Sequence, residues 1–299
     1  MSAGVLFDAP GPRGRAIQRV VAIVLAVLAI GLGIWILKAF ADKGQLAPAM
    51  WRPMLWTDTW ADYIIPGLVN TLKAAALSMV LAAVFGLVFG FGRLSEVTPV
   101  RWVSNVVVEL FRSIPVLVLM LTGYAVCLFQ LGIGPQASFI GTVVGLTLYN
   151  GAVVAELLRS GVENLPKGQR EAGLSIGLTG PQTLRAILAP QALTAMLPAI
   201  MSQLVVVLKD TALGYAITYP ELLNTANQIG GWQGNLIPAM IFIAVLYIAI
   251  NFTITTLANY LETRMRRRGH NAALPPDNTP EDKQVIPHVT TTTEMGGSM

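Results

Sequence analysis

Charged side chains recur at helical spacing inside segments that are otherwise apolar. Glu109 and Arg112 are three residues apart, and Glu156 and Arg159 repeat that spacing. Residues three apart share one face of a helix, so each couple can form an ion pair. Two interpretations of the first couple stay open: a structural ion pair near a membrane interface, or an Arg112 that meets a bound carboxylate or gates a path. For the second couple we favour a structural role.

Further polar residues interrupt the apolar segments. Lys209 and Asp210 end one of them, where they either line a path or fix a short helix. Polar side chains at membrane depth usually face the interior of a helix bundle, where they either join helices or contact a polar solute. The resulting candidate pathway residues are Asn70, Thr71, Arg112, Tyr149, Asn150, Gln203, Lys209 and Asp210.

Residue types typical of catalysis are missing from these segments. No histidine lies in any of them, no Ser/His/Asp arrangement is evident, and Cys127 is the single cysteine. A single cysteine excludes an intrachain disulfide and a cysteine-based zinc or iron–sulfur site. We therefore expect no catalytic, cofactor-binding or metal-binding residue, and we do not expect an enzyme.

The amino-acid composition is typical of a protein that lies in a lipid bilayer. Of 299 residues, 54% are hydrophobic and 12% are charged, whereas soluble domains carry roughly 25% charged residues. The mean hydropathy is +0.61. These values argue against a soluble enzyme, a secreted disulfide scaffold and a disordered protein.

Six segments are long and apolar enough to cross a membrane as helices. They cover approximately residues 17–40, 65–92, 103–131, 139–158, 191–208 and 236–261. The sequence therefore predicts an all-α integral membrane protein with six transmembrane helices. The third segment contains Pro115 and is expected to be kinked or divided. The first is longer than a signal-peptide core and is interpreted as an anchor.

Lysine and arginine are distributed unevenly between the loops. One set of loops carries 13 of them: Arg13, Arg15, Arg19, Arg93, Arg101, Arg159, Lys167, Arg170, Arg185, Arg264, Arg266, Arg267 and Arg268. The opposite set carries four: Lys38, Lys43, Arg52 and Lys209. Because basic loops stay in the cytoplasm, both termini are predicted to be cytoplasmic. The net charge of +4 is thus explained by the orientation of the chain in the membrane and by attraction of its basic loops to anionic lipid. It does not indicate nucleic-acid binding.

The basic loop at about residues 162–190 has a pattern of its own. Pro166 suits the first turn of a helix over residues 169–176, and Gly177 suits the position after its end. A second helix is expected over residues 182–190. From composition alone, this element is either a docking surface for a partner protein or a helix lying on the membrane.

The same loop resembles the EAA signature of binding-protein-dependent ABC importers. The signature residues are Glu171, Ala172, Gly173, Gly177, Ile187 and Pro190, and Gly173 replaces the usual second alanine. Further matches lie at residues 67–72, 108–115, 149–151, 155–161, 166–172, 190–193 and 208–213. Together they are similar to permease subunits for polar amino acids, the histidine/glutamine permease family. Residues 6–15 and the long first span resemble a glutamate-uptake subunit of that group.

This resemblance implies a type I ABC importer permease fold and a domain organisation. Residues 1–16 would be a cytoplasmic segment, residues 17–62 the first helix and an outer linker, and residues 63–265 the permease core. Residues 266–299 would be a basic stretch and a disordered tail, as their Pro, Thr, Asp and Asn content also indicates. The protein would span the cell membrane several times.

The resemblance also implies partners. These are a dimer of ATPase subunits holding Mg-ATP, a second homologous permease subunit in a heterodimer, an extracytoplasmic amino-acid-binding protein, and an amino-acid substrate. The chain has no Gly-x-x-x-x-Gly-Lys-Ser/Thr loop with which to bind ATP phosphates. The expected ATPase-coupling residues are Gly168, Glu171, Ala172, Gly173, Gly177, Ile187 and Pro190.

Three other classes of function make different demands on the sequence. An ion-gradient-driven transporter should show inverted repeats and interrupted helices in matching halves, which are not evident. A membrane enzyme would need a catalytic set, for which the sequence offers no candidate residues. A pure scaffold or assembly protein is a further alternative, and neighbouring genes for an ATPase, a second permease and a secreted binding protein would favour the permease over it. Within the permease class, glutamate is the expected substrate, with glutamine, aspartate, arginine and histidine as alternatives.

Overall fold

The computed structural model describes residues 11–270, and every element in that range is a helix. The chain runs through α1 Pro12–Asp42, α2 Pro48–Trp51, η1 Arg52–Leu55, α3 Thr57–Thr59, η2 Trp60–Ile64, α4 Ile65–Arg93, α5 Thr98–Ser113, α6 Val116–Ala125, η3 Val126–Gln130, α7 Ala137–Glu163, α8 Lys167–Ser175, α9 Gly180–Thr183, η4 Leu184–Leu188, α10 Ala189–Asp210, η5 Thr211–Ile217, α11 Leu222–Gln233 and α12 Leu236–His270. Residues 1–10 of the expected cytoplasmic segment (1–16) and residues 271–299 of the expected basic stretch and tail (266–299) lie outside the described residues.

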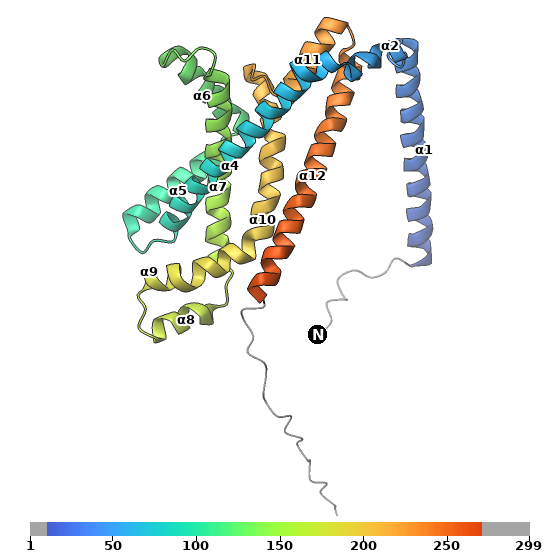
Figure 1. Ribbon diagram of the computed structural model, residues 1–299. Coiled ribbons are helices and arrows are strands. Elements are labelled where there is room, and N and C mark those ends of the chain that lie inside the picture. The colour runs from blue at the N-terminus through green and yellow to red at the C-terminus, as the bar shows by residue number, and fades with distance from the viewer. Residues whose placement is uncertain (1–10, 271–299) are drawn as a thin grey trace, which may run out of the picture.

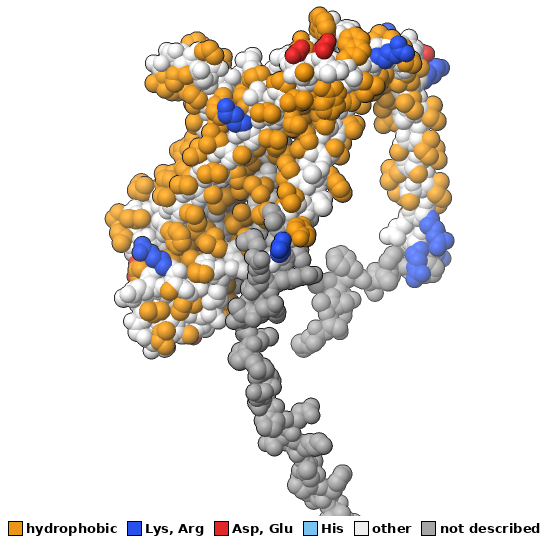
Figure 2. Space-filling model, viewed as in Figure 1, with side chains coloured by type: hydrophobic (Ala, Val, Ile, Leu, Met, Phe, Trp, Pro, Cys, Tyr) orange, Lys and Arg blue, Asp and Glu red, His pale blue; other side chains and the backbone are white. Residues whose placement is uncertain are grey.

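The prediction of an all-helical membrane protein is confirmed. Within residues 11–270, five helical stretches are long and apolar enough to span a membrane, and a sixth is counted if the bent pair α5 and α6–η3 forms one span. Figure 2 shows apolar side chains over the flanks of these helices, with lysine and arginine mostly toward the two ends. The α1 span stands apart from the other helices in Figure 1, and none of its apolar window is buried.

The third expected span is divided, as its proline indicated. α5 and α6 meet at an angle of 98° around Ile114 and Pro115. Ile114 has an extended backbone (φ −88°, ψ 128°), the conformation that a following proline favours. Pro115 lacks a backbone N–H and therefore cannot continue the hydrogen-bond ladder of α5. The amphipathic α5 thus runs beside α4 before α6 turns away (Figure 1).

The expected break before the fifth span is wrong. The second helix of the loop does not stop at Pro190: α9, η4, α10 and η5 form one stretch, Gly180–Ile217, of 38 residues. The segment η4 is a single π-helical turn directly before Ala189 and Pro190. A π turn shifts the hydrogen-bond pattern by one residue, so it accommodates the proline's missing donor without ending the helix.

Helix α7 is the centre of the bundle, where α4, α5, α6 and α10 pack against it. Small residues allow these close approaches: a Cβ at Gly145 would lie 2.7 Å from the Met120 backbone nitrogen of α6. In Figure 1, α8 and α9 lie at the same end of the bundle as the start of α1 and the end of α12, while α2 and α11 lie at the opposite end.

Candidate functional site

The helix α8 is defined by signals at both of its ends. Pro166 is the N-cap (φ −54°, ψ 129°), one position before the expected first turn. At the other end, Gly177 has φ +88°. Its N–H donates to the Leu174 carbonyl at 3.0 Å, and the Leu178 N–H donates to the Gly173 carbonyl at 3.2 Å. These two bonds form a Schellman motif, which requires the left-handed conformation that glycine adopts most readily.

One face of α8 packs against the following helices. Gly173 is buried, and a Cβ there would lie 2.6 Å from Thr183 Cγ2 and 3.0 Å from Ile187 Cδ1. The Gln191 amide also donates to the Gln169 side-chain oxygen at 3.0 Å. The hairpin has two arms, α8 and the stretch α9–η4, and a capping box of Thr179 and Gln182 fixes the chain between them. We call residues 166–190 the cytoplasmic hairpin, after the side of the membrane that the basic loops predict for it.

Five of the seven expected coupling residues lie on two surfaces of this hairpin, and the other two lie at its turn and at its end. Gly168, Glu171 and Ala172 are exposed on α8, and the helical rotation of about 100° per residue places Gly168 and Glu171 on the side opposite to Gly173. The apolar Ile176 is 74% exposed beside them. Gly173 and Ile187 lie on the inner, packed side, and Gly177 forms the turn. Pro190 lies farther along, where η4 meets α10.

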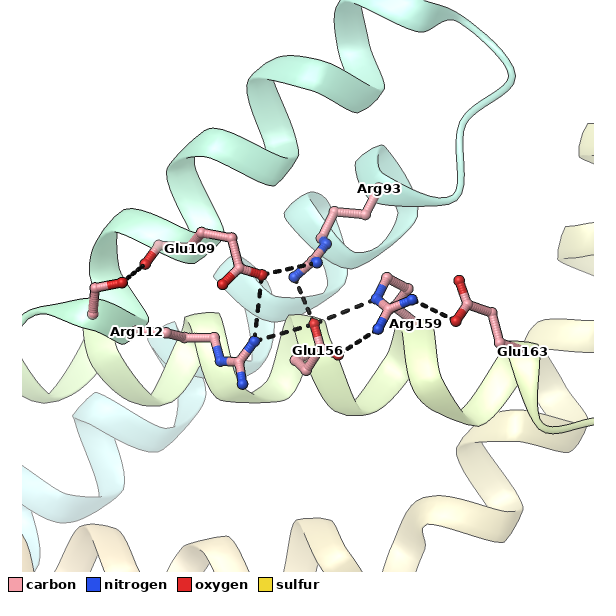
Figure 3. Close-up of polar contacts among 7 residues, drawn as sticks. Arg93, Glu109, Arg112, Glu156, Arg159 and Glu163 are labelled. Atoms are coloured by element: carbon pink, nitrogen blue, oxygen red, sulfur yellow. Dashed lines mark hydrogen bonds and ion pairs between the residues drawn. The ribbon is translucent and has the colours of Figure 1, made fainter.

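Six charged residues converge at the end of the bundle next to the hairpin. Figure 3 shows Arg93 from α4, Glu109 and Arg112 from α5, and Glu156, Arg159 and Glu163 from α7. The two expected ion pairs are present, Glu109–Arg112 at 3.5 Å and Glu156–Arg159 at 2.6 Å. They are not separate, because Arg93 joins them: its Nη2 lies 3.1 Å from Glu109 and its Nη1 lies 2.7 Å from Glu156.

Glu156 is the hub of this network. Its carboxylate contacts Arg93, Arg112 at 3.3 Å and Arg159. Arg159 is also paired with Glu163. The Arg93 side chain is only 7% exposed, so its charge depends on these carboxylates. The network therefore ties α4, α5 and α7 together where the chain enters the hairpin.

Removal of the hub charge tests this description. We expect Glu156→Gln to lower the free energy of unfolding by about 2 kcal/mol or more, because three arginines then lose a shared carboxylate. Glu163→Gln is the matched control: its side chain is 55% exposed and contacts only Arg159, so a change of about 0–1 kcal/mol is expected. The measurement is the thermal unfolding midpoint in detergent, and equal midpoints for the two variants would contradict the assignment.

The remaining pathway candidates do not converge on one pocket. Asn70 donates to the Pro220 carbonyl at 2.9 Å, and Thr71 accepts from the Leu222 N–H at 3.0 Å, so both fix the chain before α11 to α4. The Gln203 amide donates to Asn150 at 2.6 Å, joining α10 to the buried side of α7. Tyr149 is half-buried beside it.

Lys209 lines a sizeable cavity. The cavity lies between α10 and α12, has a volume of about 500 Å³, and is also lined by Tyr247 and Asn251. Asp210, the next residue, is half-buried at the end of α10. The Tyr247 hydroxyl and the Asn251 amide already donate to Glu221 and to the Tyr247 carbonyl, so the Lys209 ammonium is the group here that is suited to attract a carboxylate-bearing solute.

Sequence reasoning missed a buried carboxylate at the opposite end of the molecule. Glu221 is fully buried and caps α11 by accepting from the Leu223 and Asn224 N–H groups, both at 2.7 Å. The Tyr247 hydroxyl donates to it at 2.7 Å. Burial raises the pKa of Glu221, and these hydrogen bonds partly offset that rise. Burial, together with the charge of Glu221, raises the pKa of Tyr219 to about 12. Only the position of Glu221 before a helix start gave a hint in the sequence.

Comparison with known proteins gives one family and several relatives. The family model described as "binding-protein-dependent transport system inner membrane component" matches residues 82–267. The chain is 45% identical over 228 residues to the glutamate transport system permease protein of Corynebacterium glutamicum, covering 76% of this chain and 83% of the relative. It is 31% identical over 208 residues to the glutamate/aspartate import permease protein of Escherichia coli O6:H1, covering 68% and 93%.

A solved structure shares the fold. A chain of an amino acid ABC transporter crystallised with histidines superposes with a TM-score of 0.65 and 28% sequence identity. The match covers 72% of this chain and 98% of that chain. The region that superposes is thus close to a complete subunit of that transporter.

Proposed function

Because the chain belongs to the family of binding-protein-dependent transport system inner membrane components, we propose that it is the permease subunit of an ATP-driven importer that takes up glutamate. The chain is a multi-pass protein of the cell membrane and is a transport subunit, not an enzyme. ATP hydrolysis belongs in this proposal to a separate dimer of ATPase subunits, which holds the Mg-ATP. An ion-gradient-driven carrier is disfavoured by the family match.

The cytoplasmic hairpin is the observation that carries the coupling part of the proposal. It projects from the end of the bundle, is held by the Gly173 contact and the Gly177 turn, and exposes Glu171 and Ile176. An exposed apolar side chain beside a carboxylate is suited to enter a groove on another protein. We assign α8 as the coupling helix, with Glu171 making a charge-assisted contact to the ATPase.

Two features support glutamate as the substrate. The relatives at 45% and 31% identity are named for glutamate and for glutamate and aspartate, and Lys209 offers a cation at a cavity within the spans. The proposed assembly contains a second, homologous permease subunit and an extracytoplasmic amino-acid-binding protein. The α8 end is then cytoplasmic, and so are both termini.

Uptake of labelled glutamate in cells with and without this chain tests the proposal. We expect uptake to depend on the chain and to be inhibited by unlabelled glutamate or aspartate, because the Lys209 ammonium at the cavity attracts side-chain carboxylates. Unlabelled arginine and histidine should not compete. A partner ATPase unable to hydrolyse ATP should abolish uptake.

Three results would contradict parts of the proposal. Uptake that is unchanged without the chain, or that is inhibited best by a cationic amino acid, would overturn the glutamate assignment. Uptake that persists with an inactive ATPase but stops when the ion gradient is dissipated would overturn the ATP-driven mechanism.

A further inference from the structure

A cleft separates the cytoplasmic hairpin from the rest of the bundle. It consists of two adjoining cavities of about 400 Å³ and about 260 Å³, which share Leu94, Glu96, Val162, Arg170 and Leu188 among their lining residues. One wall is the turn between α4 and α5, and another is the end of α7. The third wall is formed by α8, α9 and η4. We call this space the hairpin cleft.

The cleft is lined by more cations than anions. Its cations are Arg93, Arg101, Lys167, Arg170 and Arg185, and its acids are Glu96 and Glu163. The acids compensate little of this charge. Glu163 is paired with Arg159, outside the cleft, and Glu96 lies 3.9 Å from Arg170, whose side chain is 64% exposed. Arg93 is balanced by Glu109 and Glu156. An anion entering the cleft is therefore attracted by the remaining cations, of which Arg101, Lys167 and Arg185 have no acidic partner within residues 11–270.

The individual cations differ in how they are engaged. Arg93 belongs to the six-residue network, and Arg101 donates to the Ser95 carbonyl at 3.3 Å. Lys167 and Arg185 form no ion pair with any residue in the range 11–270. Lys167 and Arg170 come from α8, whereas Arg101 comes from α5. An anion held between them would bridge the hairpin to the α4–α5 turn.

The other lining residues are apolar and continue toward the membrane. The walls include Phe91, Leu94, Val162, Leu165, Leu184 and Leu188. Directly beside the cleft, whose lining includes Val97, α5 exposes an apolar row on one face of the helix: Val100 at 46%, Val103 at 50% and Leu110 at 52% exposure. Figure 2 shows apolar side chains around basic ones in this part of the surface. A basic rim next to an apolar face suits a ligand that has both characters.

We propose that the hairpin cleft binds the headgroup of an anionic phospholipid. The phosphate lies among Arg101, Lys167 and Arg170, and the acyl chains follow the exposed face of α5. A soluble phosphate would use the cations but not the apolar row, which favours the lipid. The bound headgroup ties the coupling helix to α5 and so restricts the position of the hairpin relative to the spans.

Native mass spectrometry of the assembled transporter, titrated with phosphatidylglycerol or phosphatidylcholine, tests this site. We expect retained phosphatidylglycerol and much weaker retention of phosphatidylcholine. The variant carrying Arg101→Gln, Lys167→Gln and Arg170→Gln should lose at least about tenfold in affinity for phosphatidylglycerol, since each basic residue near an anionic lipid adds to the attraction for its headgroup. The same spectra report whether the ATPase subunits remain bound, so loss of lipid is distinguished from loss of assembly.

A matched variant controls for general attraction to anionic lipid. Arg13→Gln, Arg19→Gln and Arg264→Gln remove three exposed cations from the same end of the molecule but outside the cleft, and this variant should retain the lipid. Equal retention by the cleft variant and the wild type would overturn the proposal. Displacement of the lipid by millimolar inorganic phosphate would assign the site to a soluble phosphate instead. Lipid retention does not depend on which solute is transported, so this result stands apart from the glutamate assignment.

Discussion

Replacement of Glu171 by lysine or of Gly177 by aspartate is expected to abolish uptake while the protein still reaches the membrane. Glu171 is exposed and makes no ion pair with any residue in the described range. Reversal of its charge therefore costs the isolated subunit little, but it places a cation where the partner ATPase is proposed to receive a carboxylate. Such a repulsion at an interface can cost several kcal/mol.

The Gly177 variant acts on the shape of the hairpin. At φ +88° a residue with a Cβ is strained, even though no other atom lies within 4 Å of the position where the Cβ would be. The strain, of order 1 kcal/mol, weakens the Schellman motif that ends α8 and so changes the angle between the two arms. A small change of orientation is enough to misplace Glu171 in a groove.

Uptake assays combined with immunodetection in membrane fractions measure both effects. Gly44→Asp is the control for backbone strain, because Gly44 also has positive φ and open surroundings but lies in the turn after α1. Glu171→Gln is the conservative comparison and should retain part of the activity. Uptake at the wild-type rate in either main variant would refute the docking assignment.

The second large effect is expected from one added methyl group in the bundle. Gly145→Ala places a Cβ 2.6 Å from Met120 Cγ, 2.7 Å from the Met120 nitrogen and 2.8 Å from its Cα. The last two atoms belong to the backbone of α6, so a rotamer change cannot relieve the contact. Overpacking of this kind costs typically 1–3 kcal/mol. We expect a clearly lower unfolding midpoint and less protein in the membrane.

A second glycine provides the matched control for this substitution. Gly231 lies within α11, is exposed, and has no atom within 4 Å of the position that a Cβ would occupy. There, Gly→Ala should stabilise the helix by up to about 1 kcal/mol. The two variants should therefore move the unfolding midpoint in opposite directions. A Gly145→Ala protein as stable as the wild type would mean that α6 and α7 are not packed this closely.

Local signals explain how much of the fold was accessible from the sequence. Apolar runs located the spans, Pro115 marked the division of the third, and Gly177 marked the end of α8, because each depends on a few adjacent residues. Pro190 was misleading, since the π turn η4 that accommodates it has no distinct sequence pattern. Pro190 therefore predicts the end of a helix at residue 190, whereas the helical stretch continues from Gly180 to Ile217.

Long-range contacts explain most of what was missed at the site. The i, i+3 rule found Glu109–Arg112 and Glu156–Arg159, but not the contact of Arg93 with Glu156, which are 63 positions apart in the chain. Likewise, the sequence shows that Asn70 and Thr71 are polar residues in an apolar segment. It does not show that they form hydrogen bonds with Pro220 and Leu222, at the start of α11. Spacing rules identify partners on one helix and are silent about partners on another.

The unbroken stretch Gly180–Ile217 has a mechanical consequence. Its 38 residues join the hairpin to the opposite end of the bundle without a break in the helix, but the stretch is bent: in Figure 1, α9 lies across the end of the bundle and α10 rises along it. A movement of the short arm, α9–η4, is therefore passed directly to the long arm, α10. Bending is concentrated where the hydrogen-bond ladder is interrupted, at the π turn Leu184–Leu188 and at Pro198. The fulcrum is therefore close to the hairpin, and the long arm ends beside Lys209.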